Sequence, residues 1–254
     1  MEIVVQRIAA TTHSLTVQPS INADGRLGSP MLVCFNERSP PQSFFDQLAG
    51  FRNLRCINST SGKLDSYKEA DWMRRFALDV PNGSLLLLDA WPGYNASLKE
   101  RELADNEIEV RTLPAGSTPY IQPLDVGFNL QFKQFMKSLS QKIRRRNPDF
   151  ILAQRVNQAA LISLTHRQFT SQRFTEFIRY AWYKAGFYDD HPATYLTPNQ
   201  YCLKEYPANS RCKCGQLCFI RCAFCTDFLC FGHAILVGKK GSISIHQCDP
   251  KPFK

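Results

Sequence analysis

The segment SLLLLDAWPGYN, residues 84–95, joins four leucines to an aspartate and a Pro-Gly turn. The leucine run is too short and too uniformly apolar for an amphipathic helix, so it predicts a fully buried strand. Asp89 is the residue at which this strand ends. Taken alone, Asp89 is equally well explained as an N-cap or loop residue and as a metal ligand on a rigid strand end.

The sequence around this strand alternates between strand and helix patterns. Runs of β-branched residues predict strands at IVVQRIAAT, LTVQPSI and PMLVCF, with a turn at 22–25, and IEVRTLP is a further strand. Helical spacing predicts helices over 63–77, 96–104, 150–165 and 171–185, and a long helix from Phe128. Asp65 or Ser66 can cap the first of these helices, and Gly186 can end the last. This order predicts an α/β fold, a mixed sheet flanked by helices.

A second aspartate, Asp125, lies in the loop AGSTPYIQPLDVG, between the IEVRTLP strand and the long helix. The chain between Asp89 and Asp125 has room for one helix and one strand, so both acids can reach the same sheet edge. Two or three clustered carboxylates bind Mg²⁺ or Mn²⁺, which activates a water molecule or a 3′ hydroxyl for attack on a phosphodiester. We therefore expect Asp89 and Asp125 to share a divalent ion.

The two acidic motifs together resemble a known family. LLLLDAWPGYN followed by LPAGSTPYIQPLDVGF is similar to the catalytic core of DDE transposases of the Tc1/mariner superfamily, in its pogo and Tigger-like branch. In that family an apolar strand ends in the second catalytic Asp, and a loop close to LPPGTTxxxQPLDxG carries the third acid. Asp89 and Asp125 match these two positions.

The resemblance covers roughly residues 3–190. It implies an RNase H-like fold, DNA as the partner, a nuclear location, and Mg²⁺- or Mn²⁺-dependent cleavage and strand transfer with Asp89 and Asp125 as catalytic metal ligands.

Two features depart from the family pattern. The first catalytic acid of the family lies upstream of the segment matching IVVQRI, where this sequence offers only Glu2. Tyr94 and Asn95 stand where family members often carry Gly-His. We therefore expect DNA cleavage by this chain to be poor or absent. The alternative function is that of a non-catalytic, domesticated protein that binds nucleic acid or protein.

Charge also favours an anionic partner. The chain has 31 Lys and Arg against 22 Asp and Glu, a formal net charge of +9. Directly after Asp125, the segment QFKQFMKSLSQKIRRRN places apolar residues on one helical side and basic residues on the other. The basic residues are candidates for contact with DNA phosphates: Lys133, Lys137, Lys142, Arg144, Arg145 and Arg146. The alternative for each of them is a solvated helix face.

Cysteine is concentrated in the C-terminal region, where eight of the ten cysteines lie beyond residue 200. Thiolates and imidazoles in close pairs suit tetrahedral zinc, and eight ligands suit two ions. The candidate zinc ligands form four pairs: Cys212 and Cys214, Cys222 and Cys225, Cys230 and His233, His246 and Cys248. Cys218 could replace Cys214, and the alternative for all of them is a set of free cysteines in an apolar core.

Two arrangements of the pairs are open, consecutive sites or interleaved ones, and we favour the interleaved form. In that form the first and third pairs share one ion, and the second and fourth pairs share the other. About forty residues have too little core to fold alone, so zinc should contribute folding energy directly. Such a module can contact DNA or a protein partner.

The expected organisation is a DDE-like core over 1–146, a helical extension and linker over 147–200, and a zinc module over 201–254. We expect an intracellular, non-membrane protein. No apolar run approaches the roughly 18 residues that span a bilayer, and the N-terminus lacks a secretory signal pattern.

Overall fold

A computed structural model describes residues 15–238 and 242–248 of the chain. Its first sheet has three strands in the order β1 (Leu15–Gln18), β2 (Met31–Asn36) and β3 (Leu54–Ser59). β1 pairs antiparallel with β2, and β2 pairs parallel with β3. β1 and β2 confirm two of the strands predicted from the sequence, whereas IVVQRIAAT lies outside the described residues.

The leucine run forms the strand β4 (Leu85–Leu88), which pairs parallel with β5 (Glu109–Thr112) in a second sheet. The prediction that this strand is fully buried is wrong, because Leu85 is 57% exposed and only Leu88 is buried. Within the described residues β4 pairs with β5 and does not pair with β1 to β3. Among these residues the RNase H-like sheet is therefore only partly formed, as two separate pieces.

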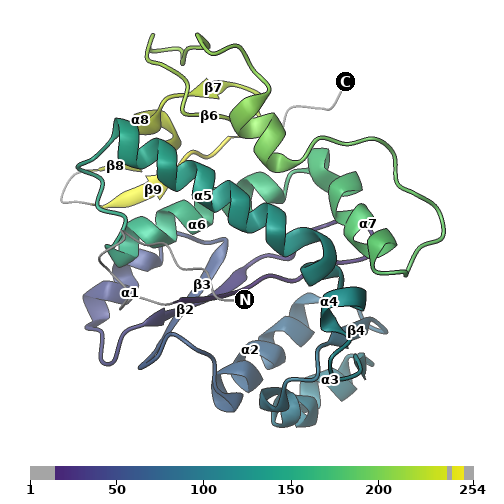
Figure 1. The fold of residues 1–254 in the computed structure, drawn as a ribbon. Coiled ribbons are helices and arrows are strands. Elements are labelled where there is room, and N and C mark those ends of the chain that lie inside the picture. The colour runs from purple at the N-terminus through teal and green to yellow at the C-terminus, as the bar shows by residue number, and fades with distance from the viewer. Residues whose placement is uncertain (1–14, 239–241, 249–254) are drawn as a thin grey trace.

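Helices surround the first sheet and connect it to the second (Figure 1). α5 and α6 lie across one side of β1 to β3, and α2 lies with β4 and α3 at the other end of the molecule (Figure 1). The helices of this part of the chain are α1 (Gln42–Leu48), α2 (Ser66–Asp79), α3 (Arg101–Asp105), α4 (Thr118–Ile121), α5 (Asn129–Arg146), α6 (Arg155–Phe169) and α7 (Thr175–Lys184).

Local signals in the sequence explain several helix ends. The side chain of Asp65 caps α2 by accepting a hydrogen bond from the backbone N–H of Lys68, 2.9 Å long. Gly186, with φ of +82°, follows α7 as a C-terminal stop. The helix expected over 96–104 is instead a 3-10 turn, η2 (Ser97–Lys99), followed by the short α3.

One large apolar cluster joins β1 to β3, the inner faces of α5 and α6, and the cysteine-rich region. Phenylalanines dominate its centre, where the rings of Phe132, Phe135 and Phe169 pack edge to face and are fully buried. A second, much smaller cluster lies between α2, β4 and α3, and it consists of Met73, Ala77, Leu88, Leu103 and Ile108. The three segments expected from the sequence thus share the main core.

The cysteine-rich region is made of short elements that lie against α5 and α6 (Figure 1). They are η5 (Gln200–Lys204), β6 (Ile220–Arg221), β7 (Phe228–Leu229), α8 (Phe231–Ala234), β8 (Ile235–Val237) and β9 (Ile243–Ile245). β6 pairs with β7 and β8 pairs with β9, both antiparallel. In the part of the chain that the structure describes, no helix combines the length and apolarity needed to cross a membrane.

Candidate functional site

Asp89 lies at the carboxyl end of β4, where the chain enters the 3-10 turn η1 (Pro92–Asn95). Its Oδ1 accepts a hydrogen bond from the backbone N–H of Trp91, 3.2 Å long, which braces the turn. The side chain is half-buried. Burial of Leu88 in the small cluster and pairing of β4 with β5 hold this strand end in place.

Asp125 lies in η3 (Leu124–Phe128), a short π-helix that leads into α5, and its side chain is exposed. Its Oδ1 accepts a hydrogen bond from Nδ2 of Asn129, 2.8 Å long. Gly127 permits this turn to lie directly on α7, since a Cβ added there would come within 2.6 Å of the Cβ of Ala181. The close packing of Gly127 on α7 therefore fixes the position of the turn. That Asp89 and Asp125 share one ion stays a prediction.

Glu69 is a further carboxyl group at this site, and it is not among the site residues predicted from the sequence. It lies in the first turn of α2 and is fully buried. Its Oε1 accepts a hydrogen bond from Nε2 of Gln18, 2.9 Å long, at the end of β1. Its Oε2 is buried and has no hydrogen-bond partner. A signal was present, because Glu69 stands four residues before Met73 on the helix face that packs inward.

Burial raises the pKa of Glu69 to about 7, although the Gln18 hydrogen bond favours the ionised form; the negative charge of Asp89 adds to the rise. Tyr94, on η1, belongs to the same group: burial, with added repulsion from Glu69 and Asp89, raises the pKa of its phenol. The end of β4, the start of α2 and η1 thus bring two carboxyl groups and a neutral phenol together.

This group fits a hard divalent cation. Mg²⁺ and Mn²⁺ prefer carboxylate oxygens as ligands. The buried Oε2 of Glu69 is such an oxygen, and it has no hydrogen-bond partner among the described residues. A positive ion between Asp89 and Glu69 would also remove their mutual repulsion.

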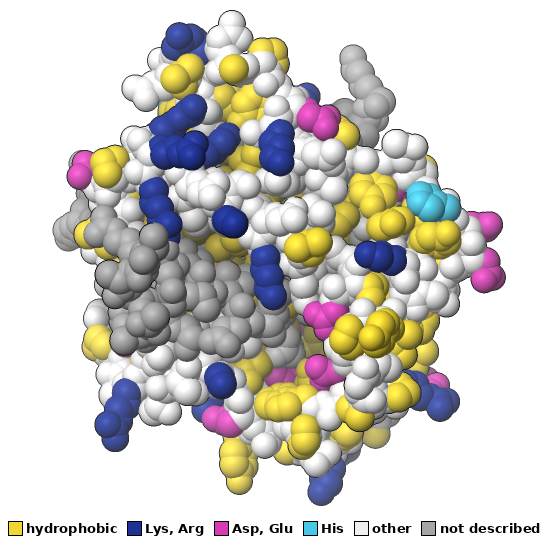
Figure 2. Space-filling view, viewed as in Figure 1, with side chains coloured by type: hydrophobic (Ala, Val, Ile, Leu, Met, Phe, Trp, Pro, Cys, Tyr) yellow, Lys and Arg dark blue, Asp and Glu magenta, His cyan; other side chains and the backbone are white. Residues whose placement is uncertain are grey.

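The basic residues of α5 differ in exposure and in their partners. Lys133, Lys137, Arg144, Arg145 and Arg146 are exposed, whereas Lys142 is half-buried. Figure 2 shows Lys and Arg side chains gathered along α5 and over the adjoining cysteine-rich region, with acidic side chains lower on the same face. The apolar side of α5, which includes Phe132, faces the main core as predicted.

Lys142 and Arg146 contact the cysteine-rich region. The ammonium of Lys142 donates to the hydroxyl of Tyr206 at 2.8 Å and to the carbonyl of Phe219 at 2.9 Å. The guanidinium of Arg146 donates to the carbonyl of Cys218, 2.9 Å away. Burial lowers the pKa of Lys142, and the nearby Arg146 adds to that effect, while Cys218 opposes it. The side chain of Lys142 therefore bonds to the cysteine-rich region and does not extend freely into solvent.

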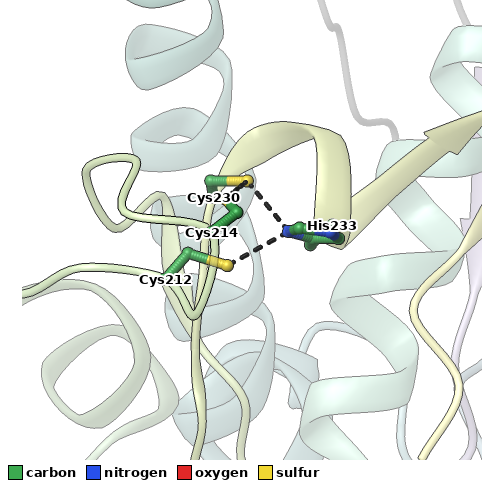
Figure 3. A group of neighbouring side chains, drawn as sticks. All are labelled: Cys212, Cys214, Cys230 and His233. Carbon is green, nitrogen blue, oxygen red and sulfur yellow. Dashed lines mark hydrogen bonds between the residues drawn. The ribbon is translucent and has the colours of Figure 1, made fainter.

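The first Cys/His cluster consists of Cys212, Cys214, Cys230 and His233, whose side chains point toward one another (Figure 3). Nδ1 of His233 lies 3.1 Å from Sγ of Cys212 and 3.3 Å from Sγ of Cys230. Sγ of Cys214 lies 3.7 Å from Sγ of Cys230. A tetrahedral zinc ion with ligands about 2.1 to 2.3 Å away has ligand separations of roughly 3.4 to 3.8 Å, so this cluster has the right size.

The second cluster consists of Cys222, Cys225, His246 and Cys248. Sγ of Cys222 lies 3.6 Å from Sγ of Cys248, and Sγ of Cys225 lies 3.5 Å from Nε2 of His246. All ligand atoms within each cluster lie within 4.8 Å of one another. The pairs are therefore grouped in interleaved order, first with third and second with fourth.

Two tight turns bring the ligand pairs together. Gly215 has φ of +84° and its N–H donates to the carbonyl of Cys212, 2.8 Å away. Thr226 has φ of +65° and its N–H donates to the carbonyl of Cys222, 3.0 Å away. A positive φ is unusual for threonine, so this turn stores strain that the packing around the second cluster must offset.

The remaining cysteines lie outside both clusters. Cys202 is fully buried in the main core. Cys218 does not replace Cys214 and lies beside Tyr206.

The second cluster is tied to α6 and to the segment that follows it. The guanidinium of Arg167 donates to the carbonyl of Cys248, 2.7 Å away. The side chain of Gln168 accepts from the N–H of Ala223, and the hydroxyl of Ser171 donates to the carbonyl of the same residue. The Cys/His region is thus held by buried polar contacts as well as by the apolar cluster.

Two family models match the sequence. The Tc5 transposase C-terminal domain matches residues 182–241, which include the first three ligand pairs. The DDE superfamily endonuclease matches residues 13–185, which include Asp89, Asp125 and Glu69. No curated protein and no solved structure matches the chain. The two family matches imply a transposase-derived, DNA-binding protein. Because the second match covers more than half of the chain, the protein belongs to the DDE superfamily endonuclease family.

Proposed function

We propose that the protein acts in the nucleus as a DNA-binding DDE domain whose acidic site carries divalent-metal phosphodiester chemistry and whose C-terminal region is folded by two zinc ions. The observation that carries the DNA-binding part is the position of α5. This helix begins four residues after Asp125 and exposes basic side chains along its length, so DNA held on α5 extends toward the acid.

The DNA contact is proposed for Lys133, Lys137, Arg144 and Arg145. Their exposed charges can lie along a phosphate backbone without a required base sequence, and such contacts release counterions. Lys142 and Arg146 are left with a supporting role, because their side-chain nitrogens donate to the cysteine-rich region. They fix the angle between α5 and that region.

The acidic site is proposed to hold Mg²⁺ or Mn²⁺ through Asp89 and Asp125. A bound ion would supply an activated oxygen nucleophile and would stabilise the negative charge that develops on the phosphoryl oxygens. The protein's own part is to present Asp89 from a braced strand end and Asp125 from a turn fixed on α7.

The two Cys/His clusters are proposed as zinc sites. Three thiolates and one imidazole at these separations are the donor set of a closed structural site rather than a catalytic one.

We further propose that the functional segments are 1–146, 147–200 and 201–254, with the last also able to recruit a protein partner.

The test of DNA binding is a salt titration with two unrelated duplexes. Arg144→Gln with Arg145→Gln should weaken binding to both duplexes alike and make the slope of log affinity against log salt smaller by roughly 2. Arg38→Gln with Arg101→Gln removes the same charge from exposed residues outside α5 and should change the slope far less. Equal effects of the two double substitutions would mean that DNA binding depends on net charge and not on an interface at α5.

The test of catalysis is nicking of supercoiled DNA with Mg²⁺ or Mn²⁺. Cleavage should be weak and lost in Asp89→Asn, with DNA binding retained. DNA binding without any cleavage would favour the non-catalytic alternative.

A further inference from the structure

Glu69 is a buried carboxyl group that packing leaves half satisfied. The residue is fully buried, and one oxygen accepts from Gln18 at 2.9 Å. The other oxygen, Oε2, is equally buried and has no hydrogen-bond partner among the described residues. Buried carboxyl oxygens are normally paired with a donor or with a metal ion, so this atom indicates a missing partner.

The surroundings of Glu69 indicate what that partner is. Asp89 directly follows Leu88, which packs in the small cluster with Met73, one turn after Glu69 on α2, and Tyr94 packs against the same cluster. Among the described residues, no Lys or Arg forms a hydrogen bond or ion pair with Glu69. A site with two acids and no protein cation suits a bound cation, and oxygen donors select a hard divalent ion.

The position of Glu69 is set by rigid structure. Met73 and Ala77, one and two turns further along α2, pack against Leu88 of β4 in the small cluster. Leu88 directly precedes Asp89, so the same contacts that hold α2 on β4 hold Glu69 beside Asp89. Gln18, at the end of β1, holds the second side of the carboxyl group. Three elements therefore fix one side chain, as a metal ligand requires.

A purely structural role explains less. A neutral Glu69 would need an acceptor for its acidic proton, and an ionised Glu69 would need a donor for Oε2. The described residues supply neither at that oxygen. An apolar residue at position 69 would fill the same space without this cost.

We propose that Glu69 is a ligand of a divalent cation that it holds together with Asp89. The proposal rests on the proposed function, since it adds a ligand to the same acidic site. It assigns to α2 a part in metal binding, alongside the strand end that carries Asp89.

The experiment measures Mn²⁺ binding to the full chain, saturated with zinc beforehand, by electron paramagnetic resonance of the free ion. The unaltered chain should bind one Mn²⁺ that Mg²⁺ displaces. Glu69→Gln should weaken this binding at least tenfold, and Asp89→Asn should also weaken it. Asp79→Asn, an exposed position on the same helix, should leave it unchanged.

Folding is monitored by thermal melting of each variant. Without Mn²⁺, Glu69→Gln should melt at or above the temperature of the unaltered chain, because it removes a buried acid. With Mn²⁺, the melting temperature of the unaltered chain should rise and that of Glu69→Gln should not. Undiminished Mn²⁺ binding by Glu69→Gln would overturn the proposal, as would an absence of Mn²⁺ binding by the unaltered chain.

DNA binding, measured in parallel without divalent ions, separates the two hypotheses. Retained DNA binding with no effect of Glu69→Gln on Mn²⁺ would overturn the role of Glu69 alone. Mn²⁺ binding through Glu69 by a chain that fails to bind DNA would overturn the proposed function alone.

Discussion

The cysteine-rich region and the β4–β5 region differ in how they join the rest of the molecule. From the sequence, the first looks like an appended module and the second like the buried centre. The structure reverses this: Phe219, Cys222 and Ile245 belong to the main core, while Leu88 belongs to a small separate cluster. A metal-binding region can therefore be part of the main core, and a strongly apolar strand can lie at its edge.

The largest expected effect is loss of zinc. The intact chain should contain two zinc ions by elemental analysis, and Cys222→Ser should lose one of them. Structural zinc contributes on the order of 10 kcal/mol of folding free energy, and Cys222 is fully buried in the main core. The cost should therefore appear in the unfolding of the whole chain, measured by calorimetry.

Two controls sharpen this result. Cys214→Ser, at an exposed ligand, should be less damaging, and Cys56→Ser, outside both clusters, should keep both ions. Chelation that unfolds residues 201–254 and leaves the unfolding of the rest of the chain unchanged would show that this region is a separate module.

The next effect concerns His166, which is fully buried in α6 and contacts the segments that precede β2 and β3. Its Nε2 lies 2.8 Å from the carbonyl of Gly28, and its Nδ1 lies 3.0 Å from Nδ2 of Asn53. Burial lowers its pKa to about 4, although the hydrogen bond with Gly28 opposes this shift. Because the folded pKa lies below the usual 6.5, this contribution to stability is complete above pH 6.5 and is lost as pH falls toward 4.

The loss should reach about 3 kcal/mol, from the difference between the two pKa values. Urea unfolding at pH 7 and pH 4.5 measures most of this loss. His166→Gln should show a smaller drop between the two pH values, whereas His191→Gln, at an exposed ring, should keep the full drop. If the free energy of unfolding of His166→Gln falls as much between the two pH values as that of the unaltered chain, His166 does not cause the acid sensitivity of the main core.

A third change tests whether the β4–β5 region opens by itself. Leu88→Ala should cost about 2 kcal/mol, at the low end for a buried leucine, because the cluster is small. Hydrogen exchange should speed up in α2, β4, α3 and β5 and stay slow in β2 and α6. Leu139→Ala, in the main core, should instead speed exchange throughout; identical patterns would mean that the two clusters unfold as one.

The smallest expected effect is at the junction of α5 with the cysteine-rich region. Lys142→Met should cost about 1 to 2 kcal/mol, since it removes the hydrogen bonds to Tyr206 and Phe219. Its effect on DNA affinity should be smaller than that of Lys137→Met, an exposed position one helical turn and a half away. Chemical denaturation and a DNA titration measure the two effects. A larger DNA effect from Lys142→Met would return this residue to the interface.

Much of the fold was predictable because its signals are local. The Asp65 cap, the stop at Gly186 and the alternating faces of α5 each depend on residues within one or two turns. The ligand pairs were predictable for the same reason, since every ligand has a partner within three residues and the turns at Gly215 and Thr226 follow. Which pairs group together depends on the packing of the region. Sequence spacing alone therefore determined which ligands come in pairs.

The tertiary structure decided which surfaces meet. Glu69 lies twenty residues before Asp89, and only the packing of α2 on β4 brings the two acids together. Lys142 looked like a member of an exposed basic face until the cysteine-rich region covered it. The leucines of β4 predicted burial, but burial depends on what packs against the two faces of the strand, and the small cluster buries only Leu88 fully. Periodicity fixes which face of an element is apolar, whereas long-range packing alone fixes what that face touches.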